Sequence, residues 1–321
     1  MSASDTSLNL VVQGLRDLAP GLREISLGSA DGQPLPVYSA GSHVVVALPL
    51  PGHVQRNPYS LLGDPEDRHT WRIAVHRQQP SRGGSAWLHE QLQPGARLTV
   101  SQPMNLFPLV RTARHHLLVA GGIGITPILS QARALARMGA SFELHCAWRS
   151  AEFALYREEL EALAGGRLHH HDASQGDVID FHRLLAQRPL GSHFYICGPG
   201  PMVRAAMDAG AALGWPAASL HSEQFIAPQG GEAFEVRLAR SGQRLTVPAD
   251  RTLLETLEAA GAPVLSLCRG GACGQCETVV LQADGELLHA DVHLTAAQRS
   301  EGRLIMPCVS RLRGGCLTLD L

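Results

Sequence analysis

Four cysteines near the end of the chain place the strongest constraint on its fold and chemistry. Cys268, Cys273 and Cys276 follow the spacing C-x4-C-x2-C, and Cys308 comes later in the sequence. Plant-type [2Fe-2S] clusters are held by four thiolates with this spacing. The glycine-rich run CRGGACGQC lets the backbone wrap closely and donate N–H groups to sulfur. The spacing therefore predicts a [2Fe-2S] site. A structural zinc site is the alternative, although such sites usually pair their cysteines as C-x2-4-C.

The composition excludes several classes of enzyme. The chain has 321 residues, 45% of them apolar and 17% charged, which predicts a folded protein of two or three domains. All 27 basic residues are arginine, so the lysine required by Schiff-base enzymes, pyridoxal-phosphate enzymes and P-loop NTPases is missing. The 27 positive charges nearly balance 29 negative ones, and no nucleic-acid partner is expected.

Targeting and membrane signals are also missing from the sequence. The N-terminus, MSASDTSLNLVVQG, lacks the basic start and apolar stretch of a secretory signal. The longest apolar run, Leu117 to Leu129, spans about 13 residues and contains glycine, whereas a membrane helix needs about 18. We therefore expect a cytoplasmic protein without a membrane segment.

The chain contains three successive segments with different sequence patterns. Residues 1–109 contain short extended pieces separated by turn formers, which is typical of a small antiparallel barrel. Residues 110–226 alternate buried-looking strands with helical patterns and so predict a parallel sheet with crossover helices. The segment IAPQGGE, Ile226 to Glu232, is interpreted as a linker, and residues 233–321 form the third segment.

The third segment begins with two local signals. The alternating runs AFEVRLAR and QRLTVP, joined by Ser241 and Gly242, predict a hairpin with a two-residue turn. Thr252 and Glu255 then match a capping box at the start of a helix.

Two glycine-rich motifs indicate nucleotide binding in the second segment. In VAGGIGITP a predicted strand turns into a helix, with Thr126 as its cap and Pro127 at its first position. The glycines permit close approach of a pyrophosphate to the helix N-terminus, although Pro127 replaces the third glycine of G-x-G-x-x-G. CGPGPM also follows a strand, which places Cys197 at the carboxyl edge of the sheet, where such sheets bind ligands.

The first segment contains two motifs that suit a flavin. In RNPYSLLGD, Tyr59 and Ser60 combine a flat ring with a hydroxyl, and SRGGS resembles a phosphate-accepting turn that opens a helix. A nicotinamide donates a hydride, whereas a [2Fe-2S] cluster accepts one electron, so a carrier must separate the pair. A flavin performs both reactions.

Together these motifs make the chain resemble the phthalate dioxygenase reductase family over essentially its whole length. NPYSL resembles the flavin motif R-x-Y-S, SRGGS the FMN phosphate turn, and AGGIGITP and CGPGPM the NAD-domain motifs. HSEQF resembles the segment that brings an aromatic ring to the flavin, and CRGGACGQC with CVSR the ferredoxin domain. The chain looks closest to the carnitine monooxygenase reductase type, whose flavin motif also has Asn at the Arg position.

The resemblance implies a multi-domain fold. Residues 1–109 would form an antiparallel β-barrel that binds flavin, 110–226 a Rossmann-like parallel α/β domain that binds NAD, and 233–321 a β-grasp ferredoxin domain. It further implies FMN rather than FAD, NADH as the electron donor, a separate Rieske-type oxygenase as the acceptor, and a monomeric chain.

The resemblance also implies which residues hold each cofactor. Those expected at FMN are Arg56, Asn57, Pro58, Tyr59, Ser60, Ala74, Val75, His76, Arg82, Gly83, Gly84, Ser85, Thr126 and Phe225. Those expected at NAD are Gly121, Gly122, Gly124, Ile125, Trp148, Arg149, Cys197, Gly198, Pro199 and Met202. No side chain is expected to act as a general acid or base, because the cofactors carry the chemistry.

Two departures from the family pattern leave details open. Asn57 stands where the flavin motif usually has Arg, and the neighbouring Arg56 is a candidate to replace it. Trp148, Arg149 and Ser150 stand where an NAD site often has an acidic group for the ribose 2′-OH. Because Arg and Ser also suit a 2′-phosphate, NADPH remains possible as the donor.

Other acceptors and one other class of function also fit the motifs. A P450, a diiron hydroxylase or a ferredoxin would be served by the same kind of reductase. A non-enzymatic redox or metal sensor is the remaining alternative, and it predicts no NADH turnover.

Histidines are numerous but receive no catalytic role. His169, His170 and His171 are consecutive, and in a strand their side chains alternate between faces, so all three cannot bind one metal ion. Together with His115 and His116 they are interpreted as strand-edge or solvated residues.

Overall fold

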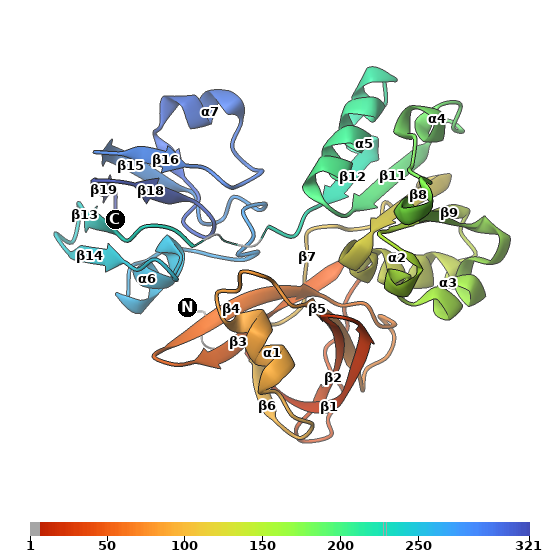
Figure 1. Cartoon of the computed structure of the whole chain (residues 1–321), viewed down its shortest axis with the longest axis horizontal. Helices are drawn as coiled ribbons and strands as arrows, with labels where there is room; N and C mark the ends of the chain where they lie inside the picture. Colours follow the sequence, from red (N-terminus) through yellow and green to blue (C-terminus); the bar gives the residue numbers. More distant parts are fainter. Residues whose placement is uncertain (1–6, 227, 229) are drawn as a thin grey trace. The chain divides into compact units, whose positions relative to one another are not determined.

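A computed structural model describes residues 7–226, 228 and 230–321 (Figure 1). These residues divide into two structural units. The first contains the chain up to Ala47 together with Tyr59–Gln79 and Ser85–Phe225, and the second contains Leu48–Pro58, Pro80–Gly84 and Ile226–Leu321. Three parts of the chain lie outside the described residues: residues 1–6, in the segment expected to lack a secretory signal, and positions 227 and 229 of the expected linker.

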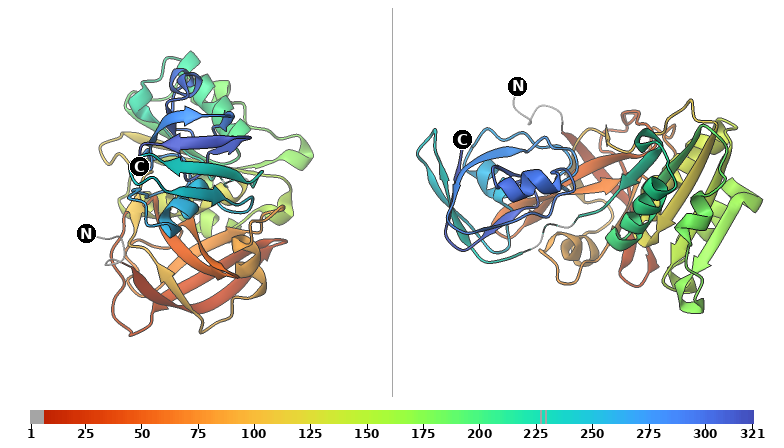
Figure 2. Two further views of the ribbon diagram at one scale, coloured as in Figure 1. Left: turned by 90° about the vertical axis from the view of Figure 1, so that its left-hand side faces the viewer. Right: turned by 90° about the horizontal axis from the view of Figure 1, so that it is seen from above.

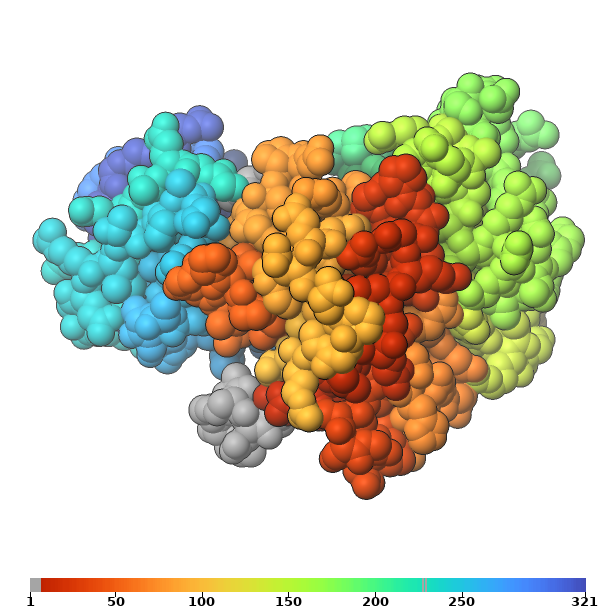
Figure 3. Space-filling view, turned by 60° about the horizontal axis from the view of Figure 1, so that its bottom comes forward, coloured from red at the N-terminus to blue at the C-terminus, as the bar shows by residue number. Residues whose placement is uncertain are grey.

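The first sheet is antiparallel and has seven strands, as the alternating pattern of the first segment predicts. Apolar residues at every second position turn inward, and Ile25, Leu27 and Trp71 are completely buried. Figure 3 shows side chains of the segments of this sheet, coloured red to orange, packed against one another. The order is β4-β3-β6-β1-β2-β5, and β7 pairs with β3. The elements are β1 (Leu8–Ala19), β2 (Leu22–Ser29), β3 (Ser42–Leu50), β4 (His53–Ser60), β5 (Trp71–His76), helix α1 (Gly84–Glu90), β6 (Arg97–Val100) and β7 (Met104–Asn105).

The second sheet is parallel and has five strands in the order β10-β9-β8-β11-β12. Helices α2 and α3 cover one face and α4 and α5 the other (Figures 1 and 2). This is the predicted α/β architecture. The elements are β8 (His115–Gly121), α2 (Ile125–Arg137), β9 (Phe142–Trp148), α3 (Arg157–Ala164), β10 (Leu168–Asp172), α4 (Phe181–Leu185), β11 (Ser192–Cys197), α5 (Gly200–Ala212) and β12 (Leu220–Glu223). Five 3-10 turns accompany them: η1 (Gly122–Gly124), η2 (Ala151–Phe153), η3 (Gly165–Arg167), η4 (Ala173–Gln175) and η5 (Ala217–Ser219).

Three predicted details of this region are wrong. The helix α2 already begins at Ile125, so Thr126 does not cap it and Pro127 is its third residue, not its first. The Thr126 hydroxyl instead donates to the carbonyl of Ile123 at 3.0 Å. His116 is neither at an edge nor solvated: β8 is the central strand, and the side chain is buried with Nε2 3.1 Å from the carbonyl oxygen of Val110. His169 to His171 do lie on an edge strand, β10, as expected.

The second unit contains a mixed five-stranded sheet in the order β14-β13-β19-β15-β17, with β13 and β19 parallel. Its core is built by the alternating residues Phe234, Val236 and Leu238 against the apolar face of α6. The elements are β13 (Phe234–Leu238), β14 (Arg244–Val247), α6 (Leu253–Ala259), β15 (Thr278–Ala283), β16 (Glu286–Leu288), α7 (Ala296–Glu301), β17 (Leu304–Ile305), β18 (Arg311–Arg313) and β19 (Cys316–Leu319). β16 and β18 form a separate pair.

Of the two local signals in this unit, one is confirmed and one needs correction. Thr252 and Glu255 form both hydrogen bonds of a capping box at the start of α6. The hairpin loop is longer than the predicted two residues, because the backbone of Leu238 pairs with Gln243 and leaves four residues between them. Gly242 closes this loop with a φ of 72°, a conformation that glycine adopts without strain.

Candidate functional site

The four predicted cluster ligands come together in the second unit. Three lie on the loop between α6 and β15, and Cys308 follows β17. Cys268, Cys276 and Cys308 are buried, and Cys273 is partly exposed. The sulfur atoms of Cys276 and Cys308 lie 3.3 Å apart, and their hydrogen bond lowers the pKa of Cys276. The fold therefore gathers side chains that the sequence separates.

Hydrogen bonds polarise the first cysteine of the loop toward its thiolate form. The pKa of Cys268 is lowered to about 5, mainly by a hydrogen bond from Cys273. Burial opposes this shift, while the backbone N–H groups of Gly270 and Ala272 donate to the same sulfur at 3.4 Å. Because thiolates rather than thiols bind metals, this donor set fits the predicted [2Fe-2S] cluster.

A neighbouring loop that the sequence analysis missed supports the cysteine loop. Gly271 has a φ of 72°, and a Cβ atom added to it would come within 2.9 Å of the Cα of Asp291. The N–H of Val292 donates to the carbonyl of Gly271 at 3.0 Å. Asp291 itself is buried and accepts from the N–H of Leu294 at 2.8 Å. No metal-ligand spacing marks these residues, so only their packing identifies them.

The two glycine-rich motifs meet at the carboxyl edge of the parallel sheet. A Cβ atom added to Gly124 would lie 2.2 Å from the carbonyl oxygen of Cys197. One added to Gly121 would lie 2.7 Å from both Pro199 and the sulfur of Met202. Glycine is therefore required for the two turns to pack together. The ends of β8 and β11 form a single surface, as expected for nucleotide binding at such an edge.

Part of the expected flavin site adjoins this edge. Residues Ala74 to His76 end β5, and β5 packs against η1, the turn that contains Gly122 and Gly124. At the end of β4, the preceding strand along the chain, the hydroxyl of Ser60 donates to the carboxylate of Glu223 at 3.5 Å. The fold thus brings the expected flavin-lining strand and the expected nucleotide turn together within the first unit.

Glu223 is a site residue that the sequence analysis did not single out. It lies beside Cys197 in the pairing of β11 with β12. The Cys197 thiol is completely buried, and its pKa is raised well above the ordinary value by burial and then by the charge of Glu223. The motif HSEQF contained this signal, but only its aromatic residue, Phe225, was assigned a role. Phe225 is 47% exposed.

The expected phosphate-binding residues divide between the two units. In the second unit a Cβ atom on Gly84 would lie 2.7 Å from the side-chain amide nitrogen of Asn57, so these two residues adjoin. The Arg82 guanidinium pairs with the carboxylate of Glu255 and donates to the backbone of Asp250. In the first unit the Ser85 hydroxyl accepts from the N–H of Gln78 at 3.0 Å.

Three further predicted residues have defined surroundings. Trp148 is buried in the core, and its indole N–H donates to His170 at 3.3 Å. Arg149 is exposed. The pKa of His76 is lowered mainly by the burial of His76 and secondly by the positive charge of Arg149. The Thr126 side chain is buried. The contacts of these residues with cofactors remain predictions.

Among the residues described by the structure, no helix combines the length and the apolar character needed to cross a membrane.

Two family models match parts of the chain. Residues 100–220 match the family described as "Dimethylamine monooxygenase subunit DmmA-like, N-terminal domain". Residues 236–313 match the "2Fe-2S iron-sulfur cluster binding domain" and include all four clustered cysteines. The second match agrees with the interpretation of the cysteine spacing and weighs against the zinc alternative.

Characterised relatives match the chain over nearly its full length. The heme-dependent oxidative N-demethylase beta subunit of Ectopseudomonas mendocina is 48% identical over 98% of this chain and 99% of its own length. The carnitine monooxygenase reductase subunit of Acinetobacter baumannii is 38% identical over 97% of both chains.

A solved structure confirms the predicted fold class of flavin barrel, NAD domain and [2Fe-2S] domain. Phthalate dioxygenase reductase matches this chain with a TM-score of 0.90 and 35% identity, and the match covers 99% of this chain and 98% of that one. Its structure is described as a modular structure for electron transfer from pyridine nucleotides to [2Fe-2S]. The four gathered cysteines of the present chain, Cys268, Cys273, Cys276 and Cys308, form what we call the cysteine cage. The chain therefore belongs to the phthalate dioxygenase reductase-like family of oxygenase reductase subunits.

Proposed function

We propose that this chain supplies electrons to a separate oxygenase protein and takes them from NADH. The observation that carries the proposal is the gathering of four cysteine sulfurs in a chain that also packs two glycine motifs at the edge of a parallel sheet. The relatives support it, because they are subunits of demethylase and monooxygenase systems.

In this proposal the chain binds FMN, NADH and a [2Fe-2S] cluster. The flavin accepts a hydride and releases electrons singly, and the cluster transfers one electron at a time. Gly124 and Cys197 would form the floor of the nicotinamide site, because a side chain on Gly124 would collide with the carbonyl oxygen of Cys197. Ser60 holds the Glu223 carboxylate at the same edge through its hydroxyl.

The donor is proposed to be NADH rather than NADPH. The family resemblance supports NADH. Arg149 points the other way, because it is exposed directly after β9, where a positive charge would attract the 2′-phosphate of NADPH. Steady-state rates with each nucleotide, in the wild type and in an Arg149→Ala variant, test this assignment. A higher kcat/KM for NADPH than for NADH in the wild type would contradict it.

The partner proposed from the sequence is a Rieske-type oxygenase. A second candidate, a heme-dependent oxygenase that removes N-methyl groups, is favoured by two observations. The 48% identical relative is the beta subunit of a heme-dependent oxidative N-demethylase, and the NAD-domain region matches the dimethylamine monooxygenase model. The monomeric state and the cytoplasmic location expected from the sequence remain predictions.

Anaerobic stopped-flow spectroscopy of the full, cofactor-loaded chain separates the two partners. NADH is mixed with the chain and either a purified Rieske oxygenase or a purified heme N-demethylase subunit. Bleaching of the Rieske absorbance supports the first candidate, and a shift of the heme Soret band supports the second. Failure of NADH to bleach the chain's own flavin and [2Fe-2S] absorbance would overturn the proposed function itself.

A further inference from the structure

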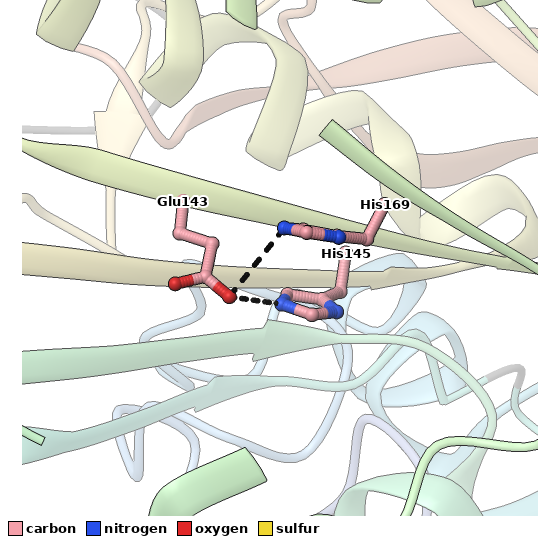
Figure 4. A group of neighbouring side chains, drawn as sticks. All are labelled: Glu143, His145 and His169. Atoms are coloured by element: carbon pink, nitrogen blue, oxygen red, sulfur yellow. Dashed lines mark hydrogen bonds and ion pairs between the residues drawn. The ribbon is translucent and has the colours of Figure 1, made fainter. Parts of the chain in front are cut away.

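A second group of metal-ligating side chains lies on the parallel sheet of the first unit. Glu143 and His145 are two residues apart on β9 and therefore share a face. His169, on the edge strand β10, is directly opposite His145 in the strand register. Figure 4 shows a ring nitrogen of each histidine directed at the Glu143 carboxylate, and one ligand atom from each of the three residues lies within 4.8 Å of the others.

The donor atoms suit a zinc ion. Two imidazoles and one carboxylate form a donor set typical of Zn²⁺. In a tetrahedral site with bonds of about 2.0–2.1 Å, neighbouring donor atoms are about 3.3–3.4 Å apart. The Glu143 Oε1 atom is 2.7 Å from the Nε2 of His145 and 3.7 Å from the Nε2 of His169, one below and one above that value. The two imidazole rings are stacked with their centroids 4.5 Å apart, so the half-exposed His169 ring would have to turn to complete the site. His145 is buried, whereas the His169 side chain is 46% exposed, which leaves one side open for a water ligand.

Surrounding residues hold these ligands in the orientation that a metal site requires. Arg188 binds mainly the other carboxylate oxygen of Glu143, Oε2, at 2.6 Å, with a longer contact of 3.4 Å to Oε1. The Nδ1 of His145 lies 3.0 Å from the Nε2 of His171, whose Nδ1 lies 3.0 Å from the carboxylate of Asp177. Metal-bound histidines almost always donate their second ring N–H in this way.

We propose that Glu143, His145 and His169 bind one Zn²⁺ ion, with His171 and Asp177 orienting the His145 ring. The site would be separate in chemistry from the cysteine cage, because its donors are nitrogen and oxygen. The alternative is that these side chains only bond one another, without an ion, and the two cases differ in whether the chain binds zinc there.

Zinc titration of the full chain, loaded with FMN and the cluster and dialysed against chelator, tests the proposal. We expect one Zn²⁺ bound per chain by isothermal titration calorimetry and a dissociation constant raised at least about tenfold by His169→Ala. The matched control is His170→Ala, an adjacent histidine whose ring contacts Trp148 instead of the three ligands. That variant should bind zinc like the wild type. Asp177→Asn, which removes only the outer contact, should weaken binding by about tenfold.

X-ray absorption at the zinc edge identifies the ligands independently of the variants. Bonds of about 2.0–2.1 Å to nitrogen and oxygen are expected, without sulfur at about 2.3 Å. Sulfur ligation would place the zinc in the cysteine cage and overturn the proposal. Absence of zinc binding, or equal affinity in the wild type and His169→Ala, would overturn it as well. Iron and FMN contents of each sample confirm that the variants are folded and loaded.

Discussion

Gly124 and Cys197 are in direct backbone contact, although they come from different motifs. A Cβ atom added to Gly124 would lie 2.2 Å from the Cys197 carbonyl oxygen and 2.8 Å from the nitrogen of Gly198. No rotation of a side chain can relieve such a collision, because the obstructing atoms belong to the backbone. The shape of the carboxyl edge therefore depends on the missing side chain at Gly124.

Replacement of Gly124 by alanine should disturb this edge. We expect Gly124→Ala to lower the free energy of unfolding by about 1–3 kcal/mol, because the added methyl group overpacks the contact. The KM for NADH should rise by about tenfold, equivalent to ~1.4 kcal/mol of binding. Gly166→Ala is the control, since Gly166 also lies in a 3-10 turn but has no atom within 4 Å of the added Cβ. Equal KM values for the two variants would contradict the prediction.

Replacement of one buried cysteine should remove the cluster and leave the NADH-binding unit active. In Cys308→Ser the iron content should fall close to zero, because a serine hydroxyl is a poor substitute for a thiolate. NADH-dependent reduction of ferricyanide, which needs only the flavin, should persist, whereas reduction of a separate oxygenase should stop. Cys316→Ser, at a cysteine outside the cluster, should retain its iron. Iron analysis and the two rate assays decide the outcome.

The buried Arg311 should be a large contributor to stability in the second unit. Its guanidinium donates to three backbone carbonyl groups, those of Glu232, Pro248 and Arg251. Arg311→Met would leave these acceptors without their charged donor, and we expect the free energy of unfolding to fall by about 2–4 kcal/mol. Arg313→Met, at an exposed arginine two residues away, should change it by less than about 0.5 kcal/mol. Urea denaturation measures both changes, and similar losses would refute the assignment.

His221 should make stability depend on pH on the acidic side of neutrality. Burial, followed by the charges of His193 and His116, lowers the pKa of His221 to about 4, whereas an unfolded histidine has a pKa near 6.5. Between these values the unfolded chain takes up a proton that the folded chain refuses, so stability falls as the pH drops below about 6.5. Above that pH both states are neutral and the effect vanishes.

A variant without the titrating ring tests this linkage. His221→Phe keeps an aromatic ring stacked on Tyr195, whose centroid is 4.4 Å from that of His221. Between about pH 7.5 and about pH 5.5 the Tm of this variant should fall less than that of the wild type. His69→Phe, at an exposed histidine, should follow the wild type. Parallel Tm curves for wild type and His221→Phe would show that His221 does not titrate as described.

Local signals in the sequence were sufficient for most of the fold. The capping box at Thr252 and the strand–turn–helix unit around Gly124 depend on residues only a few positions apart, and both formed as predicted. Where a prediction failed, a competing interaction decided. The hydroxyl of Thr126 donates to the carbonyl of Ile123. The hairpin loop is longer than predicted, because the backbone of Leu238 pairs with Gln243.

The sequence by itself predicted the four cluster ligands and the family, because the spacing of the cysteines and glycines indicates which chemistry the chain can support. Only the tertiary structure decided which distant residues meet. Glu223 lies beside Ser60 because two different sheets pack together, and His169 lies opposite His145 because the register of β10 against β9 places it there. Periodicity shows which face a side chain occupies, but which strand lies next to it follows from the packing of the whole sheet.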